Sequence, residues 1–164
     1  NPGRIISSSA KVDEKSIKER KCFLCLENLP EDQKGIKFED YLILCNPFPI
    51  FPEHFTIPNF DHTPQKIDGN FNQLLKLSKA LGERYSVFYN GPKCGASAPD
   101  HMHFQAGTKY FMPIERDYEN YIAKNKDIIF SKNDFSLFSI QSYLRNILMI
   151  ESLSESKIVE LFLR

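Results

Sequence analysis

The sequence predicts an α+β protein in which helices flank a mostly antiparallel sheet. One observation is a series of short runs rich in aromatic and β-branched residues, as strands have, at 36–38, 41–45, 54–58, 85–89 and 102–109. Another is a helix-spaced apolar stripe, which predicts a helix over 70–85: Phe71, Leu74, Leu75, Leu77 and Leu81. The chain shows no internal repeat of the length found in solenoids. Clustered strands with one long helix among them are typical of the α+β class.

The composition is that of a globular domain. The chain has 164 residues, enough to bury a core as about one domain. Hydrophobic residues make up 41% and charged residues 26%, which argues against a disordered chain. Lys plus Arg and Asp plus Glu number 21 each, so the formal net charge is zero. This balance predicts no nucleic-acid partner, although a local site for a small anion stays open.

The sequence gives no sign of export or of a membrane partner. The N-terminal stretch NPGRIISSSAKVDEK lacks the apolar core of a signal peptide, and no apolar run approaches the length of a membrane span. We therefore expect a cytoplasmic protein, trimmed or processed at its start because it lacks an initiator Met. In that compartment the four cysteines are expected to be reduced, as metal ligands or core residues.

The N-terminal part of the chain combines a polar arm with a cysteine pair. Residues 1–21 predict an extended arm with a short helical stretch around 13–20. Cys22 and Cys25 follow in the sequence CFLC, whose two-residue spacing is that of a metal knuckle.

Loops separate the strands in the middle of the chain. The segment NPFPIFP, residues 46–52, has three prolines and predicts a rigid crossover between the second and third strands. A polar loop over 59–65 leads into the helix. The loop NGPKCGASAP, residues 90–99, precedes the last strand of this series, 102–109.

The C-terminal part predicts further strands and helices. The charged region after Pro113 is expected to be partly helical over 117–126. Two strands at 135–140 and 145–151 are then followed by a helix over 154–163, with Ser at its first position as an N-cap.

Two histidines and a glutamine alternate in the sequence DHMHFQAG. On a strand, side chains alternate between faces, so His101, His103 and Gln105 are expected to share one face. Met102 and Phe104 then point into a core. Two imidazoles and an amide on one face indicate either a metal site or a catalytic surface. The alternative is a half-exposed strand with polar residues outward.

A zinc site is a better interpretation of the C-x-x-C than a redox site. Cys22 and Cys25 lack the surroundings of a thioredoxin-like motif, and His62 lies in a loop at the start of the predicted helix. The glycine-bearing loop 90–99 would also let backbone N–H groups approach a phosphate closely.

The sequence NGPKCGASAPDHMHFQ resembles the H-x-H-x-Q signature of the histidine-triad (HIT-like) superfamily. It is most similar to the transferase and phosphorylase branch: galactose-1-phosphate uridylyltransferase, diadenosine tetraphosphate phosphorylase and the GDP-hexose phosphorylases. The segment LCNPFPIFPEHFTIP is similar to paired strands that these proteins place around the nucleotide. The resemblance covers about Cys22 to Pro113 and implies a HIT-like fold.

The resemblance implies a role for each matching residue. His103 matches the nucleophile that forms a nucleotidyl-histidine, and Gln105 matches the glutamine that holds phosphate oxygens. Asn90 and Ser97 match polar residues near the phosphates, although three residues separate Ser97 from the signature where the uridylyltransferase pattern has two. Asn46 matches a residue near the ribose, and its alternative role is that of a turn former at a strand end.

The resemblance also implies a structural zinc ion. Its ligands would be Cys22, Cys25, His62 and His101, a closed set of two thiolates and two imidazoles. His101 and His103 would then have separate tasks, one architectural and one chemical.

We therefore expect a nucleotidyltransferase or phosphorylase. Its donor would be a nucleoside diphosphate sugar or a dinucleoside polyphosphate, and its acceptor phosphate or a sugar phosphate. The alternatives are a histidine-triad nucleotide hydrolase, which Gln105 argues against, and a zinc-stabilised nucleotide-binding module without catalysis. A structural role is the favoured interpretation of His54 and of Cys94. A homodimer stays open as the oligomeric state.

Two segments are expected in the chain. Residues 1–113 would form a HIT-like nucleotidyltransferase lobe with an N-terminal zinc knuckle, and 114–164 a C-terminal extension. Members of this branch commonly have two similar lobes, and the strand-rich stretch 135–151 resembles the opening of another. The sequence therefore predicts a fragment or a shortened member of the branch.

Overall fold

The computed structural model describes residues 13–19, 21–141 and 143–163. Most of the arm predicted for 1–21 lies outside these residues, and within it helix α2 (Glu14–Glu19) occupies the predicted helical stretch. Among the described residues, no helix is long and apolar enough to cross a membrane.

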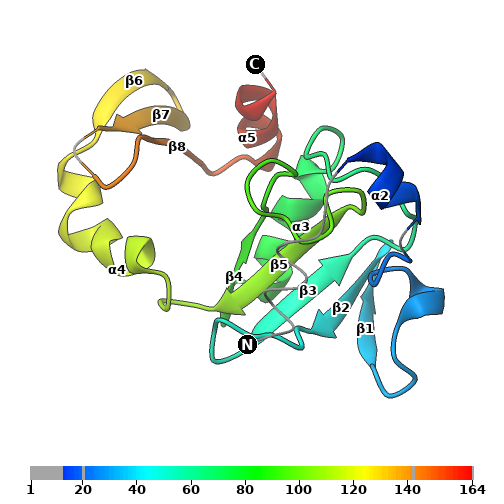
Figure 1. Ribbon diagram of the computed structural model, residues 1–164. Helices are drawn as coiled ribbons and strands as arrows, with labels where there is room; N and C mark the ends of the chain where they lie inside the picture. The colour runs from blue at the N-terminus through cyan, green and yellow to red at the C-terminus, as the bar shows by residue number, and fades with distance from the viewer. Residues whose placement is uncertain (1–12, 20, 142, 164) are drawn as a thin grey trace.

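The described part of the chain is α+β, with two antiparallel sheets (Figure 1). The first sheet has five strands in the order β1-β2-β3-β5-β4, and every neighbouring pair is antiparallel. All five were predicted: β1 (Gly35–Phe38), β2 (Tyr41–Cys45), β3 (His54–Pro58), β4 (Tyr85–Phe88) and β5 (His103–Thr108). The topology places β5, which carries His103 and Gln105 of the predicted signature, between β3 and β4.

Helix α3 (Phe71–Leu81) packs its apolar stripe on one face of this sheet. Leu77 from the helix is fully buried with side chains from the sheet and from the residue before β5: Tyr41, Ile57, Met102, Phe104 and Ala106. Met102 and Phe104 thus lie in the core, as the sequence predicted. Burial of this cluster is the main force that holds the helix to the sheet.

The helix predicted over 70–85 is shorter than expected. It ends at Leu81 because Gly82 follows, and Tyr85 pairs with Thr108 as the first residue of β4. The apolar stripe also ends at Leu81, and the strand predicted from residue 85 forms as β4.

The second sheet contains three strands in the order β6-β7-β8. Strands β7 (Phe135–Ile140) and β8 (Ile147–Ser152) were predicted within two residues, whereas β6 (Asp127–Lys132) was missed. β6 pairs with β7 through a hairpin in which Asn133 has a φ of 51°, a conformation that asparagine tolerates. The signal for β6 was the run DIIF before an Asn-Asp turn.

Helices connect the two sheets. Helix α4 (Pro113–Asn120) and the short 3₁₀ helix η2 (Ile122–Lys124) lead into the second sheet, where partly helical structure was predicted only from 117. Helix α5 (Glu155–Phe162) follows β8, with Ser154 at its N-cap position but without a side-chain capping bond.

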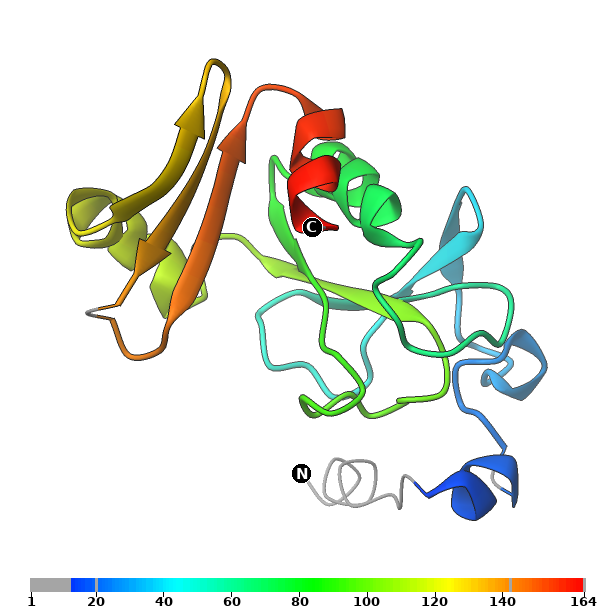
Figure 2. The ribbon, with the colours of Figure 1, turned by 90° about the horizontal axis from the view of Figure 1, so that it is seen from above.

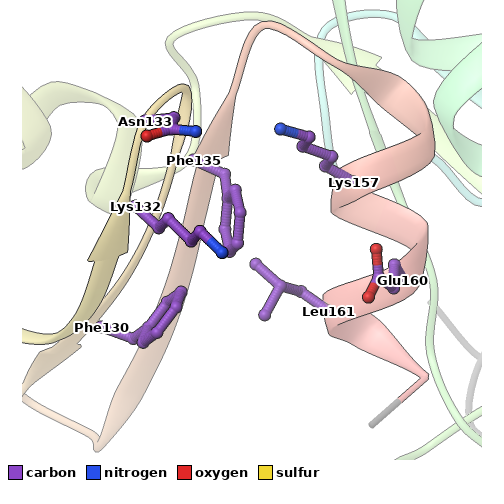
Figure 3. Close-up of a pocket in the computed structure, with 7 residues that line it drawn as sticks. All are labelled: Phe130, Lys132, Asn133, Phe135, Lys157, Glu160 and Leu161. Carbon is purple, nitrogen blue, oxygen red and sulfur yellow. The ribbon is translucent and has the colours of Figure 1, made fainter.

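Helix α5 returns to the first sheet and lies beside α3 (Figure 2). The Phe162 ring stacks on Phe71 of α3 with a centroid separation of 3.8 Å, and Lys79 pairs with Glu155 at 3.0 Å. A cavity of about 510 Å³ separates α5 from the β6–β7 hairpin. Figure 3 shows side chains of both elements around it.

Candidate metal centre and adjoining cavity

Four predicted ligands meet at one point although they lie far apart in the sequence. The ligand atoms of Cys22, Cys25, His62 and His101 all lie within 4.8 Å of one another. Among them, the Sγ–Nδ1 distances are 3.3 Å from Cys22 to His101 and 3.1 Å from Cys25 to His62. This Cys2His2 group, hereafter the metal group, could hold a metal such as zinc.

The knuckle holds its two thiols by backbone turns. The Cys25 N–H donates to the Cys22 carbonyl at 3.3 Å, and the Asn28 side-chain amide donates through Nδ2 to the same carbonyl at 2.9 Å. Both cysteines are buried. The two sulfur atoms therefore face the histidines from a single short loop.

An outer contact fixes the orientation of the His101 imidazole. His101 Nε2 lies 2.8 Å from the Asn59 carbonyl oxygen, and a carbonyl can only accept, so Nε2 carries the proton. The His101 Nδ1 thus presents a lone pair to the sulfur atoms, as metal ligation requires. His62 Nε2 lies 3.3 Å from Asp100 Oδ2, within ion-pair distance of that carboxylate.

The electrostatics of this group favour a bound cation. Burial, followed by the neighbouring Cys22 thiol, raises the pKa of Cys25 to about 12. Burial also lowers the pKa of His101, which keeps that ring neutral. A dication would stabilise the Cys25 thiolate, which burial alone disfavours. Two thiolates with two neutral imidazoles form the donor set of a tetrahedral zinc site.

The alternation predicted for the signature holds for two of its three polar residues. His103 and Gln105 lie on β5 and line one cavity, while Phe104 between them is buried in the core. His101 precedes the strand, and its ring joins the metal group instead. Only His103 and Gln105 therefore share a face of the sheet. His101 does not, because strand pairing begins only at His103.

His103 is buried and its tautomer is fixed. Its Nδ1 lies 2.8 Å from the carbonyl oxygen of His101, so Nδ1–H donates and Nε2 retains the lone pair. Burial lowers the pKa of His103, which keeps the ring neutral. A neutral imidazole with an unprotonated Nε2 is the form that can act as a nucleophile or a base.

The cavity beside His103 has a volume of about 430 Å³. All five residues predicted to act on or bind a substrate line it: Asn46, Asn90, Ser97, His103 and Gln105. Its apolar lining includes Phe23 and Leu24, the two residues between the knuckle cysteines, with Phe48 and Ile50 from the proline-rich crossover. The cavity thus combines polar and apolar lining residues, as pockets for small amphipathic ligands do.

Asn46 lines the cavity but its side chain serves the local turn. Its Oδ1 accepts from the Phe48 N–H at 2.8 Å, and its Nδ2 donates to Thr56 Oγ1 at 2.9 Å. These bonds match the turn-forming alternative that the sequence left open. Cys94 is exposed and does not line the cavity.

Gln65 is a buried residue that the sequence did not single out. It is fully buried, with its Oε1 accepting from the His103 N–H at 2.7 Å. Its Nε2 lies 2.9 Å from the carbonyl oxygens of both Asn90 and His103. The amide therefore bridges the start of β5 to the segment after β4, and no local sequence pattern marks such a role.

His54 is hydrogen-bonded within the cavity lining, in agreement with the structural role favoured from the sequence. It is buried on β3, lines the cavity, and its Nε2 lies 3.0 Å from Gln105 Oε1. The strand register pairs Thr56 with Gln105 and His54 with Gly107, which puts His54 and Gln105 on the same face. That register was the missing signal, because a lone histidine on an isolated strand has no defined partner.

The fold and the site define an α+β protein with a Cys2His2 group that could hold a metal such as zinc, beside a cavity lined by a buried histidine. The family described as a domain of unknown function, DUF4922, matches residues 1–108, and the chain belongs to this family. The match ends at the last residue of β5, so it includes the metal group and the cavity. No curated protein and no solved structure matched the chain.

Proposed function

We propose that the protein is a nucleotidyltransferase or phosphorylase that transfers a nucleoside monophosphate through a covalent intermediate on His103. The observation that carries this proposal is the hydrogen bond from His103 Nδ1–H to the His101 carbonyl, which leaves the Nε2 lone pair available in a residue that lines the cavity. The resemblance of the signature to the transferase branch of the HIT-like superfamily supports the same reaction. The donor would be a nucleoside diphosphate sugar or a dinucleoside polyphosphate.

The reaction has two displacement steps at one phosphorus atom. His103 Nε2 attacks the α-phosphorus of the donor, a P–N bond forms, and the bond from phosphorus to the bridging oxygen breaks. The leaving group departs as a sugar phosphate or a nucleotide with that oxygen. An oxygen of the acceptor, inorganic phosphate or a sugar phosphate, then attacks the same phosphorus and releases His103.

Neighbouring groups would support the shifting charge on phosphate. Gln105 lies on the same face of β5 as His103 and can reach the same phosphate. Asn90 and Ser97 line the cavity from the loop that follows β4. Polar groups arranged before the reaction stabilise developing negative charge without the cost of reorganisation.

A metal would serve the architecture of this site. Zinc held by Cys22, Cys25, His62 and His101 would supply a cross-link between the knuckle, the loop before α3 and the residues that precede β5. The two residues between the cysteines would then form the apolar wall of the cavity in a fixed position.

The test is to trap the intermediate. The protein is incubated with a panel of α-labelled nucleoside diphosphate sugars and dinucleoside polyphosphates without an acceptor, and bound label is mapped. We expect an acid-labile, base-stable label on His103 that His103→Ala abolishes and Cys94→Ser leaves unchanged. Addition of phosphate or a sugar phosphate should discharge it.

Other outcomes would identify the alternatives. A histidine-triad hydrolase would turn over donors with water alone, without need for phosphate. A binding module would bind nucleotide without label or product. Label on another residue, or full turnover in His103→Ala with a proven substrate, would overturn the mechanism.

A further inference from the structure

His54 makes hydrogen bonds at both ring nitrogens. The backbone N–H of Ile50 donates to Nδ1 at 3.3 Å, and Nε2 lies 3.0 Å from Gln105 Oε1. Because Nδ1 accepts, the proton of the neutral ring is on Nε2, and this N–H donates to the Gln105 oxygen. The His54 ring thereby holds the oxygen of the Gln105 amide and not its NH₂ group.

Aromatic packing holds the His54 ring in this orientation. Phe51 lies 5.1 Å from it between ring centroids, and Phe88 stacks on it at 6.3 Å. A Cβ at Gly107 would come within 2.5 Å of the Phe51 ring, so only glycine at this position lets Phe51 cover β5 and contact His54. The ring is buried and cannot rotate without displacing these neighbours.

We propose that His54 is a positioning residue that fixes the amide orientation of Gln105, so that the amide NH₂, rather than its oxygen, is presented to an anionic group in the cavity. The inference rests on the proposed function, because the anionic group would be the phosphate of the transferred nucleotide. With Oε1 held by His54, the free donors of Gln105 match phosphate oxygens. A reversed amide would place an oxygen lone pair against them.

The orientation matters because an amide group reverses by rotation about a single bond. Without the His54 N–H, which can only donate to Gln105 Oε1, both orientations of the Gln105 amide are accessible. Only the orientation that presents the NH₂ group stabilises a phosphate oxygen. His54 lies on the neighbouring strand and itself lines the cavity, so the test must separate an effect through Gln105 from a direct contact with the substrate.

A double-mutant cycle on the full chain tests this inference. Single-turnover labelling of His103 is measured for the native protein, His54→Phe, Gln105→Ala and the double variant. Loss of one oriented donor slows a reaction by about 100- to 1,000-fold, which is the expectation for Gln105→Ala. His54→Phe should slow labelling by a smaller factor, on the order of tenfold. The double variant should label no more slowly than Gln105→Ala. If His54 acts through Gln105, the effects of the two substitutions on the rate are not additive.

Two controls separate a loss of the His54 hydrogen bond from a loss of folding. Thermal unfolding is measured for each variant, and His54→Gln, which retains an amide donor, should recover part of the rate that His54→Phe loses. Additive losses in the double variant, or labelling of His54→Phe at the native rate, would overturn the role of His54.

A second measurement separates this inference from the proposed function. ¹⁵N NMR of the native protein should show His54 in the Nε2–H tautomer, and His54→Phe should shift the side-chain amide signals of Gln105. If no donor labels the native protein, the proposed function fails, and these spectra still decide the contact. An Nδ1–H tautomer, or unchanged Gln105 signals, would overturn the inference in either case.

Discussion

Replacement of Gln65 by methionine should cost the fold much more than replacement of an exposed glutamine. Methionine retains most of the volume of the side chain but removes both amide functions. Three backbone groups then lose a partner: the N–H and carbonyl of His103 and the carbonyl of Asn90. The perturbation is therefore a loss of hydrogen bonding at nearly constant packing volume.

The magnitude follows from the burial of these groups. His103 is 4% exposed, so water cannot replace the lost partners of its two backbone groups, whereas Asn90 is only half-buried. A buried polar group without a partner costs about 1–3 kcal/mol, so the two groups of His103 together cost about 2–6 kcal/mol. That is a large share of a domain stability of about 5–15 kcal/mol.

Gln33→Met is the matched control. Gln33 donates one exposed hydrogen bond to the Cys45 carbonyl at 3.0 Å, and water can satisfy that carbonyl after the substitution. We expect a loss of less than about 1 kcal/mol for this variant.

The stability of both variants is measured by urea unfolding followed by circular dichroism. The comparison is valid when both variants show the same slope of unfolding free energy against urea concentration. A loss of stability in Gln65→Met no greater than that in Gln33→Met would show that the bridge between β5 and the segment after β4 does not form.

Further outcomes concern the metal group and the core. Removal of bound zinc by a chelator should lower the melting temperature by roughly 8–16 °C. Metal at a thousandfold excess over its Kd stabilises the fold by about 4.1 kcal/mol. Each kcal/mol of stability changes the melting temperature of a domain of this size by about 2–4 °C. Cys22→Ser should lower the metal content below that of the native chain, measured by mass spectrometry, and unchanged content would exclude Cys22 as a ligand. Asp100 Oδ2 lies 3.3 Å from His62 Nε2 and would orient that ring once a metal is bound, so Asp100→Asn should weaken metal affinity by about 10- to 100-fold in a competition with a coloured chelator, and unchanged affinity would exclude that role. Leu77→Ala should lower the free energy of unfolding by about 2–5 kcal/mol in urea, because Leu77 is fully buried against the sheet, and a loss below 1 kcal/mol, by the same principle, would contradict that packing.

Local patterns in the sequence predicted the first sheet well because turns and prolines mark its strand ends. β2 and β3 have the predicted bounds, and the proline-rich crossover lies between them. The four candidate ligands were found from residue type, spacing and resemblance, and the fold brings them together. These features depend on short-range signals or on a motif with a fixed geometry.

Most of the remaining features depend on contacts between distant segments. The predicted end of α3 was four residues too far along, although Gly82 after the last apolar residue of the stripe is a local signal for the end of the helix, and Tyr85 pairs with Thr108. The contact between His54 and Gln105 joins residues 51 positions apart and exists only in the observed β3–β5 register. β6 was missed because its apolar run is short and follows a charged helix, so its strand character comes mainly from pairing with β7.

The two histidines of the signature are joined through one carbonyl group. The His101 ring enters the metal group, and the His101 carbonyl accepts the Nδ1–H of His103 at 2.8 Å. The ring and the carbonyl belong to the same residue, so a displacement of the His101 backbone by the knuckle would also move the carbonyl that aims the His103 ring. The metal group would therefore influence His103 by restraining the position of a hydrogen-bond acceptor, without contact with a substrate. The spacing of two residues places one imidazole in the Cys2His2 group and the next in the cavity, with only Met102 between them.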